Sequence, residues 1–265
     1  MADIEELDKA VSQLKAEGKY MEALDLVEQG LIIRKEKFGE DSEEVHKSYR
    51  QLCELCNILA TFYLQRDDSY LALDLLKRAE VLSEGDPHTQ AITFNNLSCY
   101  YRKVNKTKIA LKYLKSALSL EQDIPNTHLN LCAVYSQIGR HDMALSHVMQ
   151  SVIILQENVM NLLESNSDIK DVAPVLAVAY HNMAVELEYL KRNSEALGMY
   201  AKAVSFADEY LAPNHPVMDN VKSAYENALK ESQEGKKKKK TKGIKGLKKG
   251  QNESPLGEKS KPLED

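Results

Sequence analysis

The stretch "KTKIALKYLKSALSL", residues 106–120, is the clearest copy of a pattern that recurs along the chain. In it, Ala110 is followed by Leu114 four positions later and by Ala117 seven positions later. These spacings place the three side chains on one face of a helix. The other copies are "GKYMEALDLVEQGL" (18–31), "DSYLALDLLKRAEVL" (68–82), "RHDMALSHVMQSVII" (140–154) and "NSEALGMYAKAVSF" (193–206). Five copies of one helical face predict a repeat architecture.

A second helix with a pattern of its own is expected before each copy. A small residue stands twelve positions before the alanine and a bulky residue nine positions before it, as Ser98 and Tyr101 do before Ala110. The small side chains let two antiparallel helices approach closely, and the large ones fill the gaps between turns. One such pair cannot bury its apolar face alone, so successive pairs are expected to stack into a superhelix with a concave face.

The pattern resembles the tetratricopeptide repeat, a helix-turn-helix unit of about 34 residues, over residues 4–210. The segments "KFGEDSEEV", "EGDPHTQAI" and "YLAPNHPVM" are similar to the inter-repeat loops of kinesin light chains, and "TFNNLSCYYRK" and "AYHNMAVELEYLKR" to their first helices. The resemblance implies an all-α, right-handed superhelical solenoid. At the fourth position, where the family often has Trp, the chain has none; His128 fits worst there and predicts looser packing of the fourth repeat.

The sequence predicts two regions. Residues 1–234 form the solenoid and residues 235–265 a disordered Lys-rich tail, which lacks the apolar periodicity needed to fold. The predicted repeats span 4–38, 53–86, 91–124, 125–165 and 174–212, and a capping helix spans 214–234.

Charge divides the chain at the same boundary. Residues 1–234 hold 24 basic and 36 acidic side chains, whereas the tail holds eleven Lys and four acidic residues. The tail is expected to attach electrostatically to an acidic partner, such as tubulin tails or another acidic protein. A nuclear-import signal and a merely solvating tail are the alternatives. The lysines proposed for attachment are Lys236, Lys237, Lys238, Lys239, Lys240 and Lys242.

The sequence contains no catalytic or metal-binding motif. The sequence has no Gly-rich phosphate loop and no nucleophile elbow. Cys53 and Cys56 have metal-like spacing, but structural zinc needs four ligands, so both are expected to pack in a helix. No apolar run approaches the roughly 18 residues of a membrane span. We therefore expect a cytoplasmic, non-enzymatic protein without cofactor or metal.

The candidate binding site is the concave groove, which positions 2, 5, 6, 9, 12 and 13 of each first helix line in this family. Position six is asparagine in three successive repeats: Asn96, Asn130 and Asn182. A carboxamide carries donors and an acceptor, so it can pair with a peptide backbone of any sequence. The alternative is that these asparagines join neighbouring repeats. The other groove candidates are Asn95, Arg102, Lys103 and His181.

The sequence is compatible with two functions. The first is an adaptor or scaffold that binds an extended segment of a partner protein in the groove, in a cytoskeletal, transport or ciliary assembly. The second is a nuclear or nucleic-acid-associated scaffold that uses the basic tail. The acidic charge of residues 1–234 argues against nucleic acid, since such proteins usually extend a basic surface over a folded domain.

Overall fold

The computed structural model describes residues 4–249, with side chains up to Gln233, and all regular secondary structure in this part of the chain is helical. Its helices are α1 (Ile4–Ala16), α2 (Tyr20–Phe38), α3 (Glu43–Gln65), α4 (Ser69–Leu82), α5 (Pro87–Lys103), α6 (Thr107–Leu120), α7 (Pro125–Gln137), α8 (His141–Glu164), α9 (Ala173–Tyr189), α10 (Asn193–Tyr210) and α11 (Pro216–Lys249).

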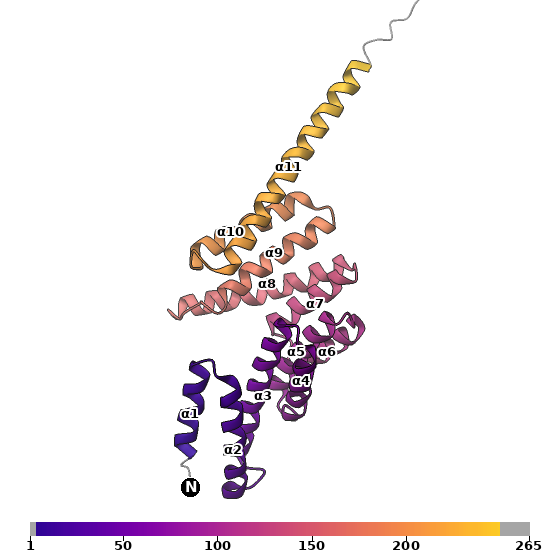
Figure 1. Ribbon diagram of the computed structural model, residues 1–265. Helices are drawn as coiled ribbons and strands as arrows, with labels where there is room; N and C mark the ends of the chain where they lie inside the picture. Colours follow the sequence, from indigo (N-terminus) through magenta and orange to yellow (C-terminus); the bar gives the residue numbers. More distant parts are fainter. Residues whose placement is uncertain (1–3, 250–265) are drawn as a thin grey trace, which may run out of the picture.

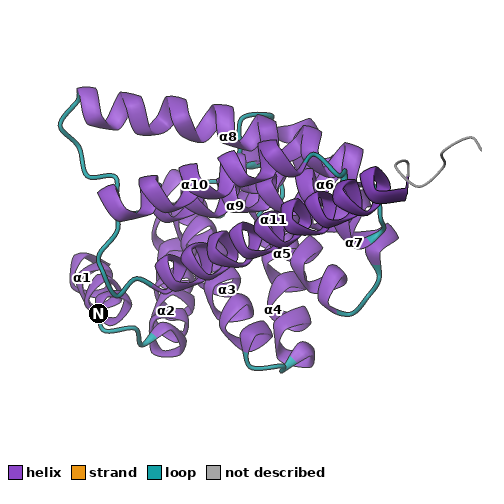
Figure 2. Cartoon of the chain, turned by 90° about the horizontal axis from the view of Figure 1, so that it is seen from above, coloured by secondary structure: helices purple, strands orange, loops and turns teal. Residues whose placement is uncertain are grey.

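The first ten helices form five antiparallel pairs that stack one after another, and α11 packs on the last pair (Figure 1). In the view from above, α11 crosses over the stack (Figure 2). Within the stack, α3, α5 and α7 lie side by side. This arrangement confirms the predicted all-α, right-handed superhelical solenoid.

The residues that recur in the sequence form the centre of each pair. All five alanines of the pattern are at most 1% exposed. The core consists of three adjoining clusters along the stack, because each pair packs only against its neighbours. The five alanines are Ala23, Ala72, Ala110, Ala144 and Ala196.

Helix starts differ from the predicted repeat boundaries. The sequence predicts the second repeat from residue 53, whereas α3 begins at Glu43. The connection before it is short because Gly39 turns with a φ of 86° and the Ser42 side chain accepts a hydrogen bond from the Val45 backbone N–H. The additional turns of α3 bury Val45, and they place Lys47 and Arg50 at the surface that α3 shares with α5.

The capping helix is longer than predicted. Val221 and Met218 of α11 are buried against the last pair, as a cap requires. The backbone then stays helical past Glu234 to Lys249, and lysine is a good helix former. Residues 235–249 are therefore helical rather than disordered. The side chains of Lys236–Lys240 and Lys242, and all of residues 250–265, lie outside the description, so disorder of residues 250–265 and the role of the tail stay predictions.

His128 does not loosen the fourth repeat. It is 8% exposed, and its Nδ1 lies 3.1 Å from Nδ1 of His147 on the partner helix α8. The His147 ring in turn stacks on Tyr135, with 5.4 Å between ring centroids. One imidazole must donate and the other accept in this contact, so at least one of the two rings must be neutral.

The histidine pair predicts that stability falls in mild acid. Burial lowers the pKa of both His128 and His147, so the unfolded chain binds these protons more readily than the folded one. Their stabilising contribution is complete above the unfolded pKa of about 6.5 and is lost as pH falls toward the folded values. Between pH 7.5 and 5.0, the free energy of unfolding should fall less for the double variant His128→Phe/His147→Leu than for the original chain. Urea unfolding at both pH values measures the two losses. Equal losses would contradict this account.

Gly30 and Gly198 both lie inside helices, and the same substitution at the two positions tests how closely the first repeat is packed. A Cβ on Gly30 would lie 2.7 Å from Nη1 of Arg34, which is 3% exposed and ion-paired to Asp8 at 2.5 Å. A Cβ on Gly198 would meet nothing within 4 Å.

We expect Gly198→Ala to raise the free energy of unfolding by about 0.5–1 kcal/mol, because alanine favours the helix. Gly30→Ala should lower it, because the buried Arg34 side chain must shift away from the new Cβ and strain its ion pair with Asp8. Chemical denaturation of both variants measures the difference. A gain of stability in both would show that Arg34 is free to move.

Candidate functional site

Two successive repeat interfaces contain the same set of side-chain hydrogen bonds. Between α3 and α5, Nδ2 of Asn57 donates to Oγ1 of Thr93 at 3.0 Å, and Nδ2 of Asn96 donates to Oδ1 of Asn57 at 2.8 Å. Each of the two asparagines is thus joined to the neighbouring first helix. We call the four asparagines of the two interfaces the asparagine ladder: Asn57, Asn95, Asn96 and Asn130.

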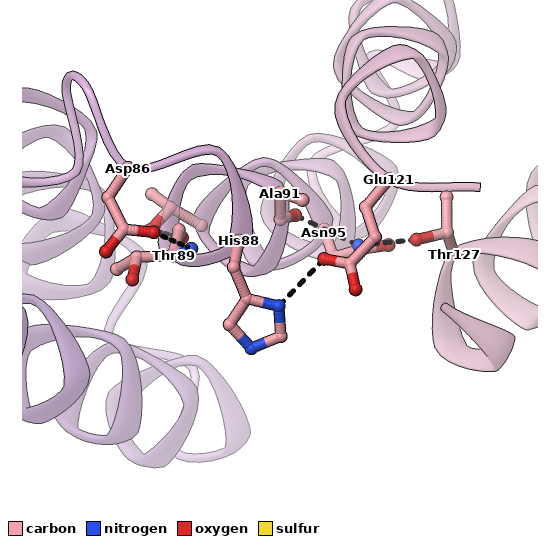
Figure 3. A network of polar contacts seen from close by, with 8 residues as sticks. Asp86, His88, Thr89, Ala91, Asn95, Glu121 and Thr127 are labelled. Carbon is pink, nitrogen blue, oxygen red and sulfur yellow. Dashed lines mark hydrogen bonds and ion pairs between the residues drawn. The ribbon is translucent and has the colours of Figure 1, made fainter. Parts of the chain in front are cut away.

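The interface between α5 and α7 repeats this arrangement. Nδ2 of Asn95 donates to Oγ1 of Thr127 at 2.7 Å and to the Ala91 carbonyl at 3.0 Å, as Figure 3 shows. Oδ1 of Asn95 accepts from Nδ2 of Asn130 at 3.2 Å. In Figure 3, His88 near the start of α5 also contacts Glu121, which directly follows α6, with 2.7 Å between Nδ1 and Oε2.

The burial of Asn57 and Asn95 gives the asparagine ladder a structural role. Asn57 and Asn95 are only 6% and 5% exposed, and a buried amide costs free energy unless its polar atoms are bonded. Both are bonded at nitrogen and at oxygen. The bonds therefore hold α3, α5 and α7 at one relative position.

The asparagines predicted to line the groove differ in their burial and in their hydrogen bonds. Asn96 and Asn130 are half-buried and both bond to the preceding repeat, which is the alternative reading of the row. Asn95 is buried rather than presented in the groove. Asn182 makes no hydrogen bond among the described residues. Beside it, Nδ1 of His181 is buried without a partner, and burial lowers the His181 pKa.

The two cationic candidates behave differently. Lys103 pairs with Asp67 at 2.5 Å and also bonds the Leu64 carbonyl, so it joins the second repeat to the third. Arg102 is exposed and has no ion pair among the described side chains. Lys103 therefore connects repeats, as the asparagines of the ladder do, whereas Arg102 faces outward.

A hollow of about 690 Å³ lies beside the ladder, between α3 and α5. Ile58 and Ile92 provide its apolar surface, and Asn57 and Asn96 provide amides. The oxygen Oδ1 of Asn96 accepts no hydrogen bond from the described residues, so this carbonyl is available to a ligand. The remaining lining residues are Lys47, Arg50, Gln51, Glu54, Thr61 and Thr89.

The hollow has a mixed charge pattern. Lys47 lies 3.9 Å from Asp8, Arg50 pairs with Glu43, and Glu54 pairs with Lys15 at 2.8 Å. Such exposed pairs contribute little to stability and exchange readily for other partners. The basic side chains of the hollow can therefore turn toward an acidic group of a ligand.

Sequence reasoning missed three members of this site. Lys47 and Arg50 were assigned to the region before the second repeat, because the predicted repeat began only at residue 53. Asn57 was not singled out, although a signal was present. Position five is asparagine and position three of the next repeat is threonine twice in succession, as Asn57 with Thr93 and Asn95 with Thr127.

The ladder predicts unequal effects for the same substitution at two sites. Asn95→Ala removes bonds to Thr127 and Asn130 and leaves buried groups unpaired, so it should lower the free energy of unfolding by about 1–3 kcal/mol. Asn182→Ala removes no such bond and should change it by less than about 0.5 kcal/mol. Thermal and chemical unfolding measure both values. Similar effects of the two substitutions would contradict a structural role of the ladder.

The family model "Tetratricopeptide repeat" matches residues 176–217, which include most of α9 and all of α10. The same paired architecture recurs in the four preceding pairs. The chain contains a tetratricopeptide repeat at residues 176–217. Its repeats are similar to those of kinesin light chains. "Protein KINESIN LIGHT CHAIN-RELATED 2" of Arabidopsis thaliana is 22% identical over 213 residues, covering 78% of this chain and 31% of that protein. The repeat protein thus spans about a third of the length of this relative.

Solved structures share the fold. BtubC (BKLC) from P. vanneervenii superposes with a TM-score of 0.62 at 13% identity, covering 93% of the repeat protein and 98% of BtubC. Pseudomonas aeruginosa PilF superposes with a TM-score of 0.53 at 16% identity and covers 71% of each chain. At these identities the likeness shows the fold alone.

The thiols and histidines of the described residues form no group of three metal-ligating side chains. Cys53 and Cys56 are buried in α3, and burial raises the pKa of Cys56 to about 12. A thiol with this pKa stays protonated and uncharged at neutral pH. No helix in the described part of the repeat protein is both long and apolar enough to cross a bilayer.

Proposed function

We propose that this protein is a non-enzymatic adaptor that binds an extended segment of a partner protein in the concave groove, at the hollow between α3 and α5. The observation that supports the proposal most strongly is the combination of apolar surface with an unused amide oxygen. Ile92 is 39% exposed inside the hollow, and Oδ1 of Asn96 lies beside it without a donor. An apolar side chain of the partner covers the isoleucines, and its backbone N–H bonds to Asn96.

The length of the hollow fits a short segment. Its α3 residues extend from Lys47 to Thr61, and fourteen helical steps span about 21 Å. An extended chain rises about 3.3 Å per residue, so roughly six residues fill this length. Lys47 and Arg50 at one end favour an acidic residue at the corresponding end of the partner.

The asparagines have a second, supporting part in this proposal. Asn96 contacts the ligand, whereas Asn130 holds α7 against α5 and keeps the groove in one shape. Asn182 and His181 lie on α9 of the fifth repeat and Arg102 lies near the end of α5, and we propose that they extend the contact for longer partners. The Lys-rich tail supplies electrostatic attachment to an acidic partner such as a tubulin tail.

The cellular setting of the proposal is a cytoplasmic cytoskeletal, transport or ciliary assembly. Its support is the likeness to a protein described as kinesin light chain-related. Nuclear import through the tail lysines is the competing proposal for localisation.

A charged substitution in the hollow tests the proposal. Peptides selected from a random library on the intact protein should bind at least about tenfold more weakly to Ile92→Glu, because a carboxylate replaces the apolar contact and repels an acidic ligand. Val81→Glu is the matched control, since Val81 is 72% exposed on α4 and does not line the hollow.

Isothermal titration of the selected peptides with both variants measures the difference. Circular dichroism verifies that each variant keeps its helical content. Peptides that bind both variants as tightly as the original chain would move the binding site away from this hollow.

A further inference from the structure

The third repeat has a charge unlike that of its neighbours. From Pro87 to Leu120 the chain has six basic residues and no Asp or Glu. The whole of residues 1–234 has 24 basic and 36 acidic side chains, so this segment is a basic band in an acidic solenoid. The six are Arg102, Lys103, Lys106, Lys108, Lys112 and Lys115.

Three of these lysines lie in a line on α6. Lys108, Lys112 and Lys115 are spaced by four and three residues, which places them on one helix face, and all three are exposed. We call them the lysine stripe. Ion pairs within the described residues engage other lysines, but none joins the stripe to a carboxylate.

The stripe borders a hollow of its own. A depression of about 510 Å³ is lined by the stripe together with Leu111, Ser116 and Ser119 of the same helix. The groove hollow is lined by α3 and α5, whereas this one is lined by α6, the second helix of the third repeat. In Figure 1, α6 lies at the edge of the stack. The two surfaces therefore belong to different helices and different faces.

We propose that the lysine stripe docks an acidic polypeptide segment of a partner protein, independently of the groove. Three uncompensated ammonium groups within about 10 Å of helix match carboxylates that are close together in one short segment. Ser116 and Ser119 add hydroxyl groups, and Leu111 adds a small apolar contact. The segment that fits has several Asp or Glu residues with at least one apolar side chain between them.

The charge of the surroundings favours a short acidic segment over a long polyanion. Outside residues 87–120, the first 234 residues contain 18 basic and 36 acidic side chains. A nucleic acid that extends beyond the stripe meets this negative potential within a Debye length, about 8–10 Å at physiological salt. A membrane surface meets the same repulsion over a still larger area.

The test uses the full-length chain with all eleven lysines after Gly235 replaced by glutamine, so that the tail does not bind the probe. The probe is a fluorescein-labelled peptide of six Glu-Ser pairs in 50 mM NaCl. Lys108→Gln, Lys112→Gln and Lys115→Gln together should weaken its binding about tenfold in fluorescence anisotropy, because three charge contacts are lost at once, and tenfold corresponds to about 1.4 kcal/mol for the three together.

The matched control replaces three exposed lysines outside the third repeat, Lys37, Lys191 and Lys230, and should change binding less than about twofold. Circular dichroism checks that both triple variants fold, which is expected because all six side chains are exposed.

Equal weakening by the two triple variants, or no binding to the tail-substituted chain, would overturn the proposal. The same chain is also titrated with a twelve-nucleotide single-stranded oligonucleotide and with vesicles containing phosphatidylserine. Tighter, stripe-dependent binding of either would assign the stripe to another polyanion and reject an acidic polypeptide. The lysine-stripe triple variant should bind the groove-selected peptides as tightly as the original chain, because the stripe and the groove hollow lie on different helices, so failure of the groove proposal is distinguishable from failure of this one.

Discussion

Each helix pair of this protein leaves an apolar face that only the next pair can cover, and the rest of the structure depends on that constraint. The alanines Ala23 to Ala196 bring the two helices of each pair close together, because nothing larger fits where they are buried. Once pairs are that close, their outer faces present a continuous apolar surface. Stacking buries this surface, and the cap formed by α11 ends it at Met218 and Val221.

The apolar contacts do not by themselves select one relative position of neighbouring pairs. From the second to the fourth repeat, the asparagine ladder adds directional hydrogen bonds between the first helices. These bonds break if one first helix shifts along its neighbour. A buried amide with an unpaired donor or acceptor costs about as much as a small apolar contact provides. The ladder therefore restricts the curvature of the groove in the region where the hollow lies.

The fold was predictable from sequence because its signal repeats. A single alanine with a bulky residue four positions later says little, but five copies with matching first helices leave few alternatives to a solenoid. Helix starts were less predictable, as α3 shows. The ten residues before position 53 belong to the repeat in space, but their polar composition resembles a loop, and only Ser42 marks the true start.

The site was predictable only in part, for a different reason. Family positions identify which residues lie on the inner side of a first helix, but not which of them a neighbouring repeat covers. Asn95 and Asn96 are adjacent in sequence, yet Asn95 is buried against α7 and Asn96 borders the hollow toward α3. The direction of each side chain depends on how far the next helix is displaced, and that displacement is a property of the stack.

Helix α5 consequently connects the interactions of both neighbours. Asn96 bonds backward to α3 and Asn95 bonds forward to α7, through consecutive residues of one rigid helix. A ligand that bonds to Asn96 therefore acts on the helix that also determines the position of the fourth repeat. The lysine stripe lies on α6, which packs against α5. Partners bound on the two faces of the third repeat contact one helix pair, so the orientation of one partner relative to the other is determined by the packing of α5 on α6.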